Sequence, residues 1–130
     1  MRYAISAVAP RSFDETVLRI TDELKKEGFG ILTTIDMQAT LKAKLGAEVP
    51  RYVILGACNP RFAHQALAAE AEIGLFLPCN VIVYEKEERV HLAAFDPEAM
   101  SALVRNPELA PLEADVRARL ERAVAAAAAV

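Results

Sequence analysis

Short apolar runs alternate with helix-start signals along this chain, and that alternation limits the folds open to it. The signals are Ser12 with Glu15, then Asp36, Asn59-Pro60 and Asp96-Pro97, and each lies just after an apolar run. Serine, aspartate and asparagine side chains accept hydrogen bonds from the first free amides of a helix, and proline is tolerated in its first turn. Apolar runs this short have the length of strands. The pattern therefore predicts successive strand–helix units.

The predicted strands are residues 3–8, 31–35, 52–57, 81–85 and 89–95, and the last two flank a hairpin turn at Lys86-Glu87-Glu88. The predicted helices run from the capping box at Ser12 to Gly28, over 37–45, from Pro60 to about residue 72, from about 97 to 104, and from about 112, after a loop at 106–111. We expect the alanine-rich end at 125–129 to pack little and to fray. The order predicts one α+β domain over residues 1–130, with helices packed on a mixed, mostly antiparallel sheet in two layers.

Composition restricts the class of partner. Hydrophobic residues make up 54% of the 130 residues and charged residues 25%, which is typical of a globular domain. The net charge is −3 and the bases are scattered among acids, so no basic stripe is available for nucleic acid. No apolar run approaches the roughly 20 residues of a membrane span, and no signal-peptide stretch follows Met1. We therefore expect a cytoplasmic protein with no nucleic-acid or membrane partner and with both cysteines reduced.

Both cysteines are followed directly by asparagine, at Cys58-Asn59 and Cys79-Asn80, although the chain has only three asparagines. A cysteine thiolate is a soft nucleophile, and the asparagine amide offers both a donor and an acceptor. The two pairs are therefore predicted to form one site, or two halves of one structural device.

Cys58 has the stronger argument for chemistry. It follows the predicted strand 52–57 and precedes a helix start, where free amides and the positive end of the helix dipole favour an anion. This placement lowers the pKa of a thiol, and Arg61 in the first helical turn adds positive charge, although Pro60 removes one amide donor. The structural alternative is that Cys58 fills the strand end as a small apolar side chain, with Asn59 serving only as a helix cap.

Cys79 follows Pro78, which cannot donate to a sheet and so marks a bulge, an edge or the start of a strand. Cys79 and Asn80 are therefore candidates for lining a pocket beside irregular backbone. The alternative is that this segment only redirects the chain into the hairpin. Because the intervening helix carries the chain back along the strand 52–57, we expect the two sulfurs to lie near each other without a disulfide, unless the two strands are antiparallel.

His64 lies one turn into the helix that begins at Pro60. It is a candidate base toward Cys58, or a metal ligand together with the thiols, and the alternative is an ordinary surface histidine. No C-x-x-C or H-x-x-x-H spacing occurs, so we expect no metal site. The glycines match no phosphate-binding or dinucleotide pattern, so we also expect no cofactor.

Several motifs of the chain are shared with one family. They are Gly28-Phe29, Leu32-Thr33, Ile35-Asp36, Leu41-Lys42, Lys44-Leu45-Gly46, Ile54-Leu55-Gly56-Ala57-Cys58-Asn59-Pro60, Ala63-His64, Ala66-Leu67, Leu77-Pro78-Cys79-Asn80-Val81 and Asp96-Pro97 with Met100. Through them the chain resembles the domain-of-unknown-function 302 family of bacterial and archaeal proteins over nearly its whole length. The resemblance implies a small α/β fold and a homodimer, without an established activity. The two Cys-Asn segments are its most specific part.

Two functions remain open, and the sequence does not decide whether the protein is an enzyme. In the first, a pocket at Cys58, Asn59, Cys79 and Asn80 holds a small polar or anionic ligand. Cys58 would be the reactive thiolate, the amides would orient the ligand, and Arg61 would contact the anion, with thiol-based transfer or redox work as the reaction class. In the second, the chain is a non-catalytic structural or interaction module acting as a homodimer. The hydrophobic faces of the hairpin and the helices could form the dimer interface.

Overall fold

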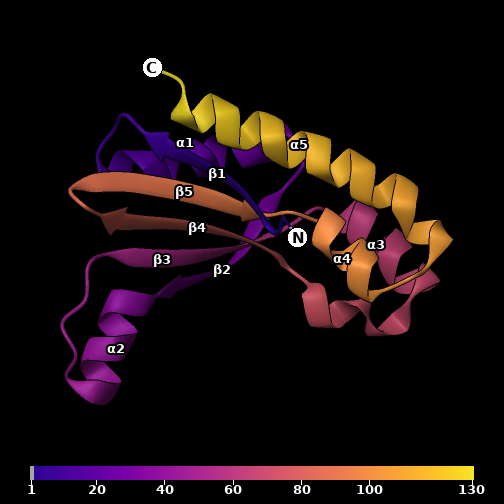
Figure 1. Cartoon of the computed structure of the whole chain (residues 1–130), viewed down its shortest axis with the longest axis horizontal. Coiled ribbons are helices and arrows are strands. Elements are labelled where there is room, and N and C mark those ends of the chain that lie inside the picture. Colours follow the sequence, from indigo (N-terminus) through magenta and orange to yellow (C-terminus); the bar gives the residue numbers. More distant parts are fainter. Residues whose placement is uncertain (1) are drawn as a thin grey trace.

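The computed structural model describes residues 2–130 as a five-stranded sheet with two long helices on one face (Figure 1). The strands are β1 (Ala4–Ala9), β2 (Gly30–Asp36), β3 (Tyr52–Cys58), β4 (Cys79–Lys86) and β5 (Arg89–Phe95), in the order β1-β5-β4-β3-β2. Each neighbouring pair of strands is antiparallel. The predicted α+β fold is therefore confirmed, with a sheet that is antiparallel throughout.

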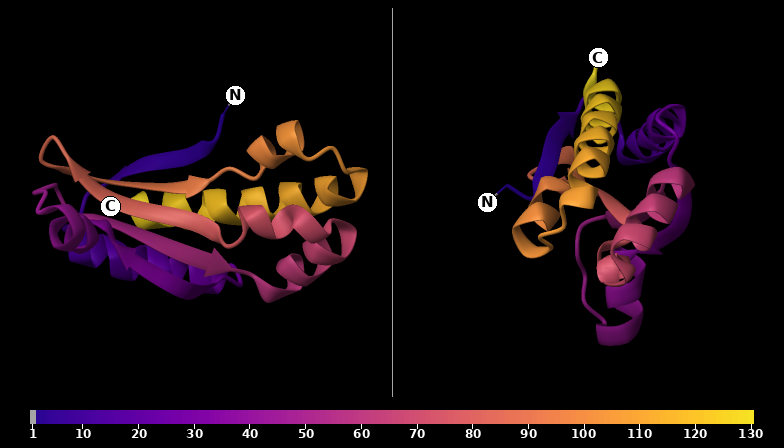
Figure 2. Two further views of the ribbon diagram at one scale, coloured as in Figure 1. Left: turned by 90° about the horizontal axis from the view of Figure 1, so that it is seen from below. Right: turned by 90° about the vertical axis from the view of Figure 1, so that its right-hand side faces the viewer.

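The helices are α1 (Phe13–Lys26), α2 (Met37–Leu45), α3 (Pro60–Ala69), α4 (Glu98–Leu103) and α5 (Ala110–Ala128), with short 3₁₀ helices η1 (Ala71–Phe76) and η2 (Pro107–Leu109). α1 and α5 pack side by side against the sheet, and α2 lies on the opposite side (Figures 1 and 2). α3, η1 and α4 gather beyond one end of the strands. This end is where the predicted site residues are found.

Local chemistry sets most helix boundaries as expected. The Ser12 hydroxyl accepts a hydrogen bond from the Glu15 amide at 3.2 Å, which is the N-cap half of the predicted capping box. The Glu15 carboxylate accepts from the Ser12 hydroxyl at 2.8 Å, in place of the Ser12 backbone amide that a full capping box would use. Asp36 accepts from the Ala39 amide at 2.9 Å and caps α2. The chain leaves α1 through Gly28 and α2 through Gly46, whose φ values of +90° and +65° favour glycine.

Alternation along the strands sends one set of side chains toward α1 and α5. The fully buried members of the resulting core include Leu55, Val81, Val83 and Leu92 from the sheet, Ile20 and Leu24 from α1, and Leu120 from α5. Burying a side chain of this kind stabilises the fold by roughly 1.5–3 kcal/mol. The core therefore fixes which face of the sheet is covered.

The expected fraying at residues 125–129 is wrong. α5 continues to Ala128, and Ala127 is fully buried in the core. The Arg11 guanidinium donates to the carbonyls of Ala127 at 2.8 Å and Ala129 at 2.6 Å. These carbonyls have no hydrogen-bond partner within the helix. Arg11, which is distant in the sequence, therefore stabilises the C-terminal end of α5.

The expected end of α3 near residue 72 is also wrong, because the helix stops at Ala69. The Asn106 side-chain amide donates to the Ala69 carbonyl at 2.9 Å and to the Glu70 carboxylate at 3.2 Å. Glu70 is extended, and the chain then forms η1 in place of the last helical turn. The segment predicted as a loop contains η2, so α5 begins at Ala110, slightly before the predicted start.

Candidate functional site

A small cavity lies where the end of the sheet meets α3, η1, α4 and α5. Its volume is about 50 Å³. Cys58, Asn59 and Cys79 line it together with apolar side chains such as Phe62 and Met100. Three of the six predicted site residues are thus brought together, although α3 separates Asn59 from Cys79 in the sequence.

The two cysteines lie at the facing ends of neighbouring strands. Cys79 begins β4 opposite Ala57, and Cys58 is the next residue along β3. Both cysteines are half-buried, and Cys79 also packs against the hydrophobic core. Both cysteines are free thiols.

The two thiols differ in their chemistry. Burial raises the pKa of Cys79 from 9.0 to about 11, and nearby Cys58 contributes further to the increase. Cys79 is therefore protonated at neutral pH and is a poor nucleophile. Any nucleophilic role in the cavity falls to Cys58.

Asn59 does not act as the predicted side-chain cap. Its backbone is extended, with φ −104° and ψ 104°, as a residue preceding a helix should be, but its side chain makes no capping hydrogen bond to α3. The amide nitrogen instead lies over Gly28, where an added Cβ would approach it to 2.8 Å. Asn59 thus occupies space left by a glycine, and its amide is not used to cap α3.

Arg61, His64 and Asn80 are outside the cavity lining. Arg61 and His64 are exposed on the outer side of α3, because the helix turns Phe62 and Ala66 toward the cavity. Asn80 pairs with Gly56 and is exposed on the sheet, since successive strand residues point to opposite faces. The six predicted residues therefore do not form a single constellation.

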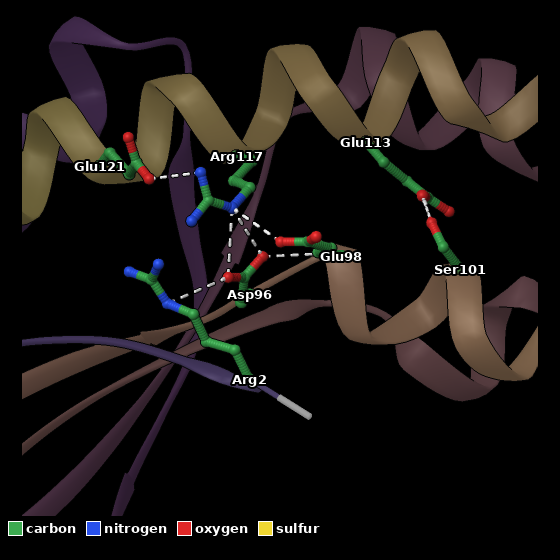
Figure 3. A network of polar contacts seen from close by, with 7 residues as sticks. All are labelled: Arg2, Asp96, Glu98, Ser101, Glu113, Arg117 and Glu121. Atoms are coloured by element: carbon green, nitrogen blue, oxygen red, sulfur yellow. Dashed lines mark hydrogen bonds and ion pairs between the residues drawn. The ribbon is translucent and has the colours of Figure 1, made fainter.

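Glu113 is a cavity residue that the sequence does not reveal. It is only 8% exposed, lines the cavity from α5, and accepts a hydrogen bond from the Ser101 hydroxyl of α4 (Figure 3). Its position beside an apolar helical stripe looks like any solvent-facing glutamate. Glu113 is buried because α4 packs against α5, and that packing depends on residues distant in the sequence.

Asp96 organises the polar side of this region (Figure 3). The sequence predicts it only as a helix cap, and it does accept from the Glu98 amide at 2.9 Å. Its carboxylate is also fully buried, and the Arg117 guanidinium of α5 donates to both oxygens at 3.1 and 3.2 Å. Asp96 thereby ties the end of β5 and the start of α4 to α5.

Within residues 2–130, no group of three or more histidine, cysteine, aspartate or glutamate side chains is arranged to hold a metal ion. In the same part of the chain, no helix combines the length and apolar character needed to cross a membrane.

Comparison with known proteins supports the family and the fold. The family model described as domain of unknown function DUF302 matches residues 5–127. A crystal structure of an uncharacterized conserved protein DUF302 from Bacillus stearothermophilus is similar, with a TM-score of 0.91 and 27% sequence identity, over 98% of this chain and 99% of that one. No curated protein matches the chain.

Proposed function

This chain belongs to the family of the domain of unknown function DUF302, and from that premise we propose that it binds a small ligand in the cavity at Cys58, Asn59 and Cys79. One observation carries the proposal: a thiol and an asparagine amide that does not cap its helix line the same hollow. Concave, mostly apolar sites with a few polar groups are the usual form of small-molecule sites.

The cavity lining favours a small ligand with an apolar body and one polar group. A volume of about 50 Å³ has room for only a few non-hydrogen atoms. The body would contact Phe62 and Met100, and the polar group would pair with the Asn59 amide. An anionic ligand has less support, because Arg61 is exposed and lies outside the lining.

Thiol chemistry enters this proposal at Cys58. With an electron-poor double bond in the ligand, the Cys58 sulfur forms a bond to one carbon and the thiol proton passes to the other. This addition is balanced without an oxidant or a reductant. Cys79, held protonated by burial, would then act as part of the wall and as a weak hydrogen-bond donor.

Filling the cavity tests the proposal. Ala66 lines the cavity from α3, while Ala68 on the same helix is exposed, so Ala66→Leu and Ala68→Leu form a matched pair. Protein purified from its own host should retain a small bound mass in native mass spectrometry. We expect Ala66→Leu to lose that mass and Ala68→Leu to keep it. Retention by both variants, or no bound mass in the wild type, would count against the proposal.

The raised pKa of Cys79 makes a separate prediction about alkylation. In a Cys58→Ser variant, iodoacetamide should modify native Cys79 at pH 8 about a hundred-fold more slowly than the urea-unfolded chain, because two pKa units reduce the thiolate fraction by that factor. Since the pKa is higher in the folded state, the associated stabilisation is present below pH 9 and is lost as pH rises through about 11. In the Cys79→Ser variant, the alkylation rate measures the reactivity of Cys58 alone. Equal rates for native and unfolded Cys79 would contradict the prediction.

A non-catalytic structural or interaction module is the second candidate function. It is supported by the packing of Cys79 against the core, which is how an inert buried cysteine behaves. In that case Cys79→Ala should lower stability, and Cys58→Ala should change neither a bound mass nor a melting temperature. The alternative fails if Cys58→Ala abolishes a retained ligand while leaving stability unchanged.

A further inference from the structure

A surface groove between α4 and α5 adjoins the cavity at Glu113. Its volume is about 360 Å³. Its lining residues are Glu98, Ser101, Ala110, Glu113, Ala114 and Arg117. Glu113 also lines the cavity, so this side chain lies between an apolar hollow and a larger polar one. The groove therefore offers space for a part of a ligand that the cavity, at about 50 Å³, is too small to hold.

Glu113 is a buried carboxylate that lacks a counter-charge. Its Oε2 accepts a hydrogen bond from the neutral Ser101 hydroxyl (Figure 3), and within residues 2–130 its Oε1 accepts none. In the same part of the chain Glu113 makes no ion pair, whereas the other buried carboxylates, Asp96 and Glu23, pair with arginine or lysine. Burying a carboxylate without a charged partner is costly. A cation at Oε1 would offset that cost, and Oε1 is not sealed within the protein.

The charges around the groove favour a cation over an anion. Arg117 lines the groove, but its guanidinium already pairs with three carboxylates, those of Asp96 at 3.1 Å, Glu98 at 3.5 Å and Glu121 at 2.5 Å. Arg2 adds only a longer contact of 3.8 Å to the first of these. With Glu113, four carboxylates thus face two guanidinium groups. The excess of negative charge attracts a cation and repels an anion.

We propose that the groove binds the ammonium group of an amphiphilic amine whose apolar end lies in the cavity. This inference rests on the ligand binding proposed above and names the chemical class of that ligand. The ammonium would donate to Oε1 of Glu113 and provide the counter-charge that this carboxylate lacks. The apolar end would contact Phe62 and Met100 in the cavity. The ligand thus carries its charge outside the cavity, in addition to the polar group that pairs with Asn59.

Three probes of similar size and different charge test the proposal. Butylammonium, butanol and butyrate are titrated separately into the whole chain, and binding is followed by the NMR chemical shifts of the backbone amides. The amides of Cys58 and Glu113 should shift, which places the probe in the cavity and at its border with the groove. We expect butylammonium to bind at least about ten-fold more tightly than butanol, because hydrogen bonds to charged groups are stronger than neutral ones. Butyrate should bind most weakly of the three.

Glu113→Gln removes the charge and keeps an acceptor for the Ser101 hydroxyl. In this variant the dissociation constants of butylammonium and butanol should agree within about two-fold. Glu108→Gln is the matched control, because Glu108 is exposed on η2 and lines neither the cavity nor the groove. It removes the same charge from the chain, and the preference for butylammonium should persist.

A second variant keeps the test decisive where Glu113→Gln fails to fold. Ala114 is exposed on α5 and lines the groove but not the cavity. Ala114→Leu should therefore remove the roughly ten-fold preference and leave butanol binding unchanged. Equal binding of butylammonium and butanol or butyrate by the wild type, or a preference that survives either folded variant, would overturn the ammonium proposal and leave the cavity proposal intact. Binding of none of the three probes would count against both.

Discussion

The Asp96→Ala variant should lose about 2–4 kcal/mol of the free energy of unfolding. Asp96 is fully buried and accepts from the Arg117 guanidinium and the Glu98 amide. Removing one partner of a buried ion pair leaves the other without compensation and costs about 3–5 kcal/mol. The lower end is expected here because Arg117 keeps a quarter of its side chain exposed. Urea unfolding followed by circular dichroism gives the value directly.

Glu121→Ala is the control for this variant. Glu121 also pairs with Arg117, but its side chain is 44% exposed, so its removal should cost less than about 1 kcal/mol. Comparable losses for the two variants would show that burial of Asp96 does not set the strength of the network. Because Pro97 and Glu113 line the cavity, Asp96→Ala should also loosen ligand retention.

Gly56→Ala is the second variant with a large expected effect, a loss of about 1–3 kcal/mol. A Cβ at this position would press on the Thr33 hydroxyl and lie 2.8 Å from Cγ of Pro78. The threonine can rotate, whereas the proline ring is held by its backbone. Pro78 also lines the cavity, so its displacement should reduce ligand retention as well as stability.

Gly30→Ala provides a matched substitution on the neighbouring strand. No atom lies within 4 Å of a Cβ added at Gly30, which pairs with Cys58. Since alanine restricts the unfolded chain more than glycine does, we expect no loss or a gain of a few tenths of a kcal/mol. Equal destabilisation by the two variants, measured in the same urea experiments, would mean that contact with Pro78 is not the cause.

Local sequence signals predicted the elements of this fold well, because their causes are local. The Ser12 cap, the Asp36 cap and the turn at Gly46 act within a few residues. The ends of α3 and α5 were missed for the opposite reason. They are set by Asn106 and Arg11, which reach them from distant parts of the chain.

The site was predicted only in part, for the same physical reason. Cys58, Asn59 and Cys79 follow from the ends of adjacent strands. Which residues of α3 face inward depends on how the helix packs, so Arg61 and His64 were assigned to a pocket from which the helix turns them away. Glu113 lines the cavity only because α4 packs against α5, and no short sequence motif predicts that packing.

The outer position of β1 has a consequence for synthesis on the ribosome. Among the strands of residues 2–130, β1 pairs only with β5, so Ala4 must wait for Phe95, about ninety residues later. At roughly 5–20 residues per second, that wait lasts about 5–20 seconds. During it the nascent chain holds an apolar strand with no hydrogen-bonding neighbour. Until its partner strand is synthesised, an unpaired apolar segment of this kind is prone to aggregation.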